Sequence, residues 1–70
     1  MIEPTENQTM NFMSVLIKLG LNENEVCGIV SAIKSENMLI EMLDKMEENN
    51  FKLTPRQTMN ICCQVIKENL

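Results

Sequence analysis

The apolar residues of this chain recur at one spacing, and that spacing constrains the fold more than any other feature. Large apolar side chains fill the pattern i, i+3, i+4, i+7 in residues 12–19, 26–33 and 39–46. This spacing places four side chains along one face of a helix, whereas a strand would divide them between two faces. Residues 58–65 fit the same pattern with Thr58 in the first position. The sequence therefore predicts an all-α fold, a small bundle of four short helices.

Helix-capping residues mark the ends of the first two segments. Thr5 is followed three positions later by Gln8, which predicts a capping box at Thr5 and a helix that begins near Glu6. Gly20 can adopt the left-handed conformation that ends many helices, so we expect the first helix to end there. Asn22 and Glu25 form a second capping-box pair. The second helix should therefore follow the first after a very short loop.

The later boundaries are marked unequally. Ser35 and Asn37 can each cap a third helix, but neither has a glutamate or glutamine three residues later. Asn49 or Asn50 can supply a left-handed end to that helix. The stretch LTPRQT, residues 53–58, has a threonine cap, a proline at the first helical position and a glutamine at the third. These residues predict the start of the fourth helix.

The two halves of the chain resemble each other. Residues 21–37, LNENEVCGIVSAIKSEN, align with residues 53–69, LTPRQTMNICCQVIKEN, and the preceding helices align if residues 12–19 are set on residues 39–46. A two-helix unit written twice is one explanation, and convergence of two amphipathic hairpins is the other. Both explanations predict two helix hairpins packed together.

Length and charge limit the function classes. A chain of 70 residues forms one domain, with a core barely large enough to fold without a disulfide, a metal or a partner. We expect a single domain over residues 1–70, with residues 1–5 flexible.

The net charge of −4, with no histidine, repels phosphate backbones and anionic lipids, which argues against nucleic acid as a partner. No apolar run approaches the ~20 residues of a membrane span, so we expect a cytoplasmic protein without a membrane partner.

The sequence offers no set of residues for catalysis or metal binding. A nucleophile needs a neighbouring base, and the chain lacks histidine and a glycine-rich phosphate loop. Cys27, Cys62 and Cys63 cannot all pair, and they lack the further ligands of a closed zinc site. We expect reduced, buried thiols, no cofactor, no metal and no enzymatic activity.

Residues 15–29 have the outline of a helix-turn-helix, with Gly20 in the turn and apolar residues where two helices would pack. A recognition helix also needs side chains that bind bases and phosphates. The exposed start of this second helix instead offers two asparagines and two glutamates, in residues 22–25. A homodimeric helix-turn-helix-like regulator is therefore the alternative reading of the chain, and not the preferred one.

Two sets of residues are candidates for binding a partner. The first set widens the apolar stripes of the first and last helices and consists of Met10, Met13, Ile17, Met59, Cys63 and Ile66. The second set is acidic and consists of Glu41, Asp44, Glu47 and Glu48. A core that wraps these helices on two sides is the competing explanation for the first set. The preferred prediction is a small acidic protein-binding module, an inhibitor or adaptor acting on a basic or nucleic-acid-binding protein, with a second copy of the chain as another possible partner.

Overall fold

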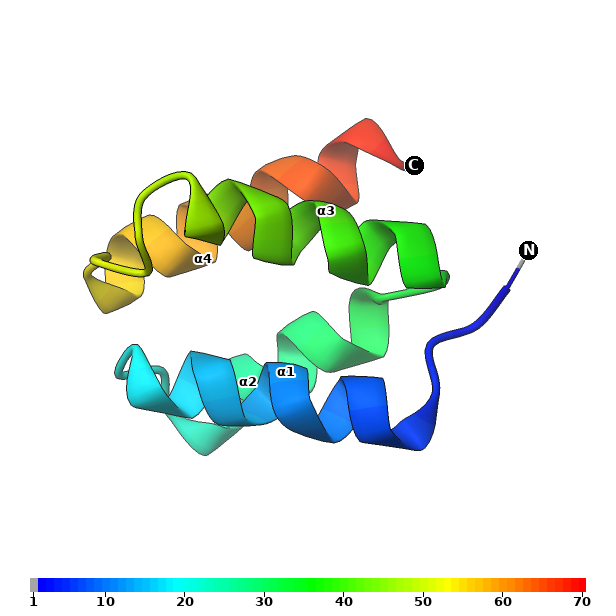
Figure 1. Ribbon diagram of the computed structural model, residues 1–70, viewed down its shortest axis with the longest axis horizontal. Coiled ribbons are helices and arrows are strands. Elements are labelled where there is room, and N and C mark those ends of the chain that lie inside the picture. The colour runs from blue at the N-terminus through cyan, green and yellow to red at the C-terminus, as the bar shows by residue number, and fades with distance from the viewer. Residues whose placement is uncertain (1) are drawn as a thin grey trace.

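The computed structural model describes residues 2–70, and these residues form four α-helices without a strand (Figure 1). The helices are α1 (Glu6–Lys18), α2 (Glu23–Ala32), α3 (Glu36–Glu47) and α4 (Pro55–Glu68). The predicted all-α fold of four short helices is confirmed. None of these helices combines the length and the hydrophobicity that crossing a membrane would require.

The helices pack as two hairpins. α1 packs against α2, α3 packs against α4, and contacts between α2 and α4 join the two pairs. Figure 1 shows α1 and α3 running in the same direction on the near side of the molecule, with α2 and α4 behind them. The predicted pair of packed hairpins is therefore the observed arrangement.

The core lies where the apolar faces of the four helices meet. Its buried hydrophobic residues are Phe12, Leu16, Leu21, Val26, Ile29, Met38, Leu39, Met42, Met46, Cys62 and Val65. One polar side chain, Thr58, is also fully buried, and its hydroxyl donates a hydrogen bond of 3.0 Å to the carbonyl of Thr54. This bond satisfies the hydroxyl, so Thr58 can occupy the apolar position that the helical pattern assigned to it.

The predicted capping boxes begin three of the helices. Thr5, Asn22 and Thr54 each accept a hydrogen bond from the backbone three residues later, and the side chain at that position bonds back to the cap. Ser35, and not Asn37, caps α3, and its hydroxyl accepts from the backbone of Met38 without completing a box. Local hydrogen bonding therefore fixes the helix starts that the sequence predicted.

The first helices of the two hairpins end in the same way. Gly20 has φ +96°, its N–H donates to the carbonyl of Ile17, and the next N–H, from Leu21, donates to Leu16. After α3, the N–H of Asn50 donates to Glu47 and that of Phe51 donates to Met46. Both ends have the paired bonds of a Schellman motif. The left-handed end predicted at Gly20 is confirmed, and the second lies at Asn50.

Phe51 continues the left-handed conformation that begins at Asn50. Asn50 has φ 54° and Phe51 has φ 56°. Asparagine tolerates this region, but for a residue as bulky as phenylalanine the left-handed backbone conformation costs about 1–2 kcal/mol. A second left-handed residue at this position could not be predicted, because phenylalanine does not favour that conformation.

The helix ends indicate a different alignment of the first helices of the two hairpins from the alignment that the apolar pattern suggested. Ser35 lies 30 residues after Thr5, and Asn50 lies 30 residues after Gly20. The predicted alignment of residues 12–19 with 39–46 uses a shift of 27. A helical apolar pattern repeats every three to four residues, so an alignment can slip by one turn and keep its match. Duplication itself stays a hypothesis.

The N-terminal segment lies against the start of α3. The backbone carbonyl of Ile2 accepts a hydrogen bond of 2.7 Å from the N–H of Glu36. The side-chain amide of Gln8 donates to the carboxylate of Glu36 at 3.3 Å. The predicted flexibility of residues 1–5 stays a prediction, and Met1 lies outside the described residues.

Candidate functional site

The acidic candidate residues lie on α3 and at its C-terminal end. Asp44, Glu47 and Glu48 are exposed, and Glu41 is half-buried. Their carboxylates are therefore available to a cationic partner, Glu41 less than the others. The structure places three of these residues on α3 and Glu48 directly after it, at the C-cap.

The apolar candidates on α1 divide into two kinds. Met10 and Ile17 are 57% and 59% exposed, whereas Met13 is half-buried and packs against the core. Between α1 and α2 lies a mainly apolar hollow of about 420 Å³, lined by Met13, Ile17, Leu21, Glu23, Val26 and Cys27. We call this the α1–α2 hollow. Exposed apolar surface of this kind costs solvation free energy unless a partner covers it.

The apolar candidates on α4 are mostly at the edge of the core. Met59 and Ile66 are half-buried and pack against the buried cluster, whereas Cys63 is exposed. For Met59 and Ile66, the competing explanation of a core that wraps the helix on two sides therefore fits the observed packing. The sequence pattern could not separate these residues from Met10 and Ile17, because both sets lie beside an apolar stripe.

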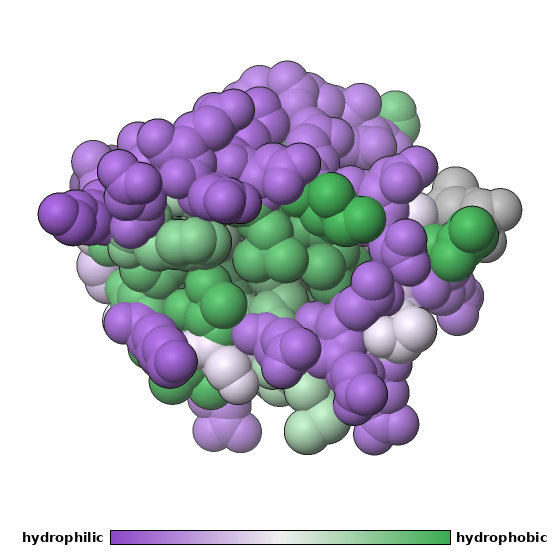
Figure 2. Space-filling view, viewed as in Figure 1, coloured by the Kyte–Doolittle hydropathy of each residue, from purple (hydrophilic) through white to green (hydrophobic). Residues whose placement is uncertain are grey.

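A second apolar hollow was not predicted from the sequence. It has a volume of about 290 Å³ and lies between the C-terminal half of α1 and the loop after α3, where it is lined by Val15, Lys18, Leu19 and Phe51. Phe51 is 40% exposed. Figure 2 shows hydrophobic side chains along the near side of the molecule, between polar rows that belong to the two helix pairs. Val15 and Leu19 were assigned to the core stripe of their helix, and they are only half-buried.

The cysteines correct one prediction. Cys62 is buried, but Cys27 and Cys63 are exposed, and all three thiols are free. Adjacent residues of a helix point about 100° apart, so Cys62 and Cys63 cannot both face the core. Burial, together with a smaller effect of the nearby Cys63, raises the pKa of the Cys62 thiol from 9.0 to about 12. Cys62 is thus a thiol at neutral pH and a poor nucleophile.

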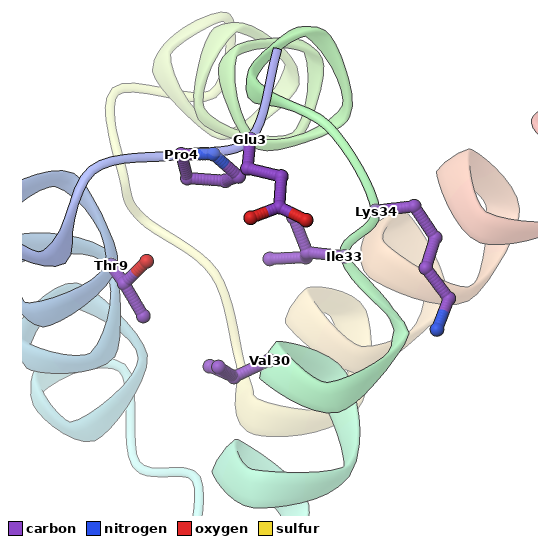
Figure 3. Close-up of a pocket in the computed structure, with 6 residues that line it drawn as sticks. All are labelled: Glu3, Pro4, Thr9, Val30, Ile33 and Lys34. Carbon is purple, nitrogen blue, oxygen red and sulfur yellow. The ribbon is translucent and has the colours of Figure 1, made fainter. Parts of the chain in front are cut away.

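A third hollow lies under the N-terminal segment, with a volume of about 310 Å³. Figure 3 shows Glu3 and Pro4 on the N-terminal segment above it, with Thr9 on α1, Val30 on α2 and Ile33 directly after α2 along its sides. The ammonium group of Lys34 points away from the carboxylate of Glu3 in this view. The hollow therefore brings together one carboxylate and one hydroxyl, without a paired base.

The remaining chemical features concern metals and nucleic acids. Among residues 2–70, no group of three or more cysteine, aspartate or glutamate side chains is placed to hold a metal ion. In the helix-turn-helix alternative α2 would be the recognition helix. Its first turn carries Glu23 and Glu25, and its last turn has no basic residue. These carboxylates are negatively charged, whereas binding to the phosphates of DNA would need cations at this position.

Comparisons with protein-family models, with curated proteins and with solved structures found no match for this chain. Its surface is therefore the basis for a functional proposal.

Proposed function

We propose that this protein is a small acidic protein-binding module that acts as an inhibitor or adaptor on a basic or nucleic-acid-binding protein. The observation that carries the proposal is the surface of α1, which has an open apolar hollow on each side. Exposed apolar patches bordered by charged residues are typical of protein-binding sites. The role is one of binding, and it assigns no residue to catalysis.

Charge supports the kind of partner. The exposed carboxylates of Asp44, Glu47 and Glu48 lie within two turns of α3 or directly after it. With a net charge of −4, the molecule attracts basic surfaces over distances of about a Debye length, which is about 8 Å at physiological salt. The same charge repels nucleic acid, so a nucleic-acid-binding protein is a better partner than its ligand.

The cysteines support a place of action. We propose that the protein works in the cytoplasm, where thiols stay reduced. Three free cysteines, two of them exposed, suit a reducing compartment.

Affinity capture with a charge-reversed variant tests the proposal. The test variant combines Asp44→Lys, Glu47→Lys and Glu48→Lys. The control combines Glu3→Lys, Glu6→Lys and Glu68→Lys, three exposed residues outside α3 that change the net charge by the same amount. The control should retain most of the proteins that wild type captures from a cytosolic lysate, as read by quantitative mass spectrometry, and the test variant should lose them. Capture that the two triple variants reduce equally would contradict a role for α3.

A further inference from the structure

The facing sides of α1 and α3 form one continuous surface. Gln8, Val15 and Leu19 follow the spacing i, i+7, i+11, which places them on one stripe of α1. On α3, Glu36, Ile40, Leu43 and Glu47 follow i, i+4, i+7, i+11 and form another stripe. The hydrogen bond between Gln8 and Glu36 joins the two stripes at one end, and at the other end Phe51, which follows α3, lines a hollow with Val15 and Leu19 of α1. We call the surface between them, together with Phe51, the α1–α3 face.

The α1–α3 face is apolar along its centre and open to solvent. Val15, Leu19 and Leu43 are half-buried, and Ile40 and Phe51 are each 40% exposed. Direct packing joins α1 to α2 and α3 to α4, whereas α1 and α3 make little contact with each other. The hydrophobic side chains on the near side in Figure 2 lie between these two helix pairs. The two hairpins therefore leave an apolar strip uncovered along their junction.

Phe51 is the large aromatic side chain at one end of this strip. It lines the hollow with Val15 and Leu19, and its backbone is held in the left-handed region by the bond to Met46. Strained backbone conformations persist where the surrounding structure or function requires them. Aromatic residues, phenylalanine among them, are also enriched at protein–protein interfaces. Phe51 is therefore suited to anchor a partner.

The charges along the two edges differ. The α3 edge carries Glu36 and Glu47 on the stripe itself, and exposed Asp44 lies one turn from Ile40. The α1 edge is mostly uncharged, since Asn7, Asn11 and Ser14 precede its one base, Lys18. A helical partner with cations on one side would pair them with α3 and turn its other side toward α1. The α3 helix has 12 residues, so its edge is about 18 Å long and matches about three turns of a bound helix.

We infer that the α1–α3 face binds an amphipathic helix of another protein, a helix whose apolar stripe is bordered on one side by lysine or arginine. Phe51, Ile40 and Leu43 contact its apolar stripe, and Glu36 and Glu47 pair with its cations. This inference rests on the proposed protein-binding function and names its site and the chemistry of its partner. It differs from the α1–α2 hollow, which holds the apolar candidates that the sequence suggested on α1.

Two synthetic peptides test the inference by fluorescence anisotropy. Each is a labelled helix of about 16 residues with leucines at i, i+3, i+4 and i+7, and one carries lysines beside the stripe where its twin carries glutamates. The lysine peptide should bind at least about ten times more tightly than the glutamate twin. Its affinity should fall as salt is raised from about 0.1 M to about 0.5 M, because screening weakens exposed charge pairs.

Two matched isoleucines locate the site. Ile40→Lys changes the α1–α3 face, and Ile17→Lys changes the far side of α1. The wild-type Ile17 side chain is 59% exposed and that of Ile40 is 40% exposed. Ile40→Lys should weaken binding of the lysine peptide at least about tenfold, whereas Ile17→Lys should change it less than about twofold. Phe51→Gly should also weaken binding at least about tenfold. Its helical circular dichroism should stay unchanged, because glycine adopts the left-handed conformation without strain.

Several outcomes would overturn the inference. A stronger loss with Ile17→Lys would assign the peptide to the α1–α2 hollow, and equal binding of the two peptides would remove the role of charge. Absence of binding by either peptide would reject a helical partner. Wild type that sediments as a dimer and becomes monomeric with Ile40→Lys would show that a second copy covers this face. In each of these cases the lysate capture can still succeed, so failure of this site is separate from failure of the protein-binding function.

Discussion

The two glycines of the chain have opposite roles. Gly20 has φ +96°, and a Cβ atom there would lie 2.9 Å from Cγ of Pro55. Gly28 is in the middle of α2, and a Cβ atom there would have no neighbour within 4 Å. Gly20 is thus required by the turn, and Gly28 only lowers helix stability.

We predict opposite effects when each glycine is changed to alanine. Gly20→Ala should lower the free energy of unfolding by about 1–2 kcal/mol, because alanine is strained at this φ and must displace the proline ring. Gly28→Ala should raise it by about 0.5–1 kcal/mol, because alanine has the higher helix propensity. Urea unfolding followed by circular dichroism measures both. A loss of stability with Gly28→Ala would mean that the bare backbone of α2 has another role.

The buried thiol of Cys62 predicts a pH dependence of stability. Its pKa rises from 9.0 to about 12 on folding, so the unfolded chain loses this proton first as the pH increases. The contribution of Cys62 to stability is therefore complete below pH 9 and declines as the pH approaches 12. Urea unfolding at several alkaline pH values should show a steeper loss for wild type than for Cys62→Ala. Parallel curves for the two proteins would contradict the burial of this thiol.

At the scale of the helix, the cap of α4 offers a clean test. Thr54 accepts from the backbone of Gln57 at 3.1 Å, and the Gln57 side chain accepts from the backbone of Thr54 at 2.9 Å. Thr54→Ala should lower the free energy of unfolding by about 1 kcal/mol, because alanine cannot satisfy that backbone donor. Asn60→Ala, at an exposed position inside the same helix, is the control and should cause no loss. Urea midpoints compare the two variants.

The elements that the sequence predicted are those with local causes. Thr5, Asn22 and Thr54 begin helices through bonds that span three residues, and the apolar spacing gives each helix its buried face. The α1–α3 face has no local cause. It depends on how the two hairpins are placed against each other, and the spacing of residues along the chain does not predict that placement. Phe51 lies in a loop, where no periodic pattern marks a side chain as buried or exposed.

At the scale of the whole molecule, the apolar residues outside the core decide whether two copies associate. Ile17 is 59% exposed, whereas Ile66 is half-buried against the core. Ile66→Glu should destabilise the fold, because it places a carboxylate at the edge of the apolar cluster. Ile17→Glu should leave the fold intact.

Sedimentation equilibrium with these variants tests self-association. If copies associate through the apolar side chains of α1, wild type should sediment as a dimer and Ile17→Glu as a folded monomer with an unchanged circular dichroism spectrum. Ile66→Glu serves as the comparison that loses helicity. A wild type that sediments as a monomer at high protein concentration would remove the second copy from the possible partners.

The two ends of the described chain lie close together beside α3. Ile2 and Asn69 line one hollow with Ser35, Glu36 and Asn37, and the N-terminal segment bonds to Glu36. Figure 1 shows both ends on the same side of the molecule, opposite the loops that close the hairpins. The order of the hairpins along the chain is thus not fixed by their packing. A circular permutant, with a short linker joining the ends and new termini opened between α2 and α3, would carry α3 and α4 first and keep every helix contact in place.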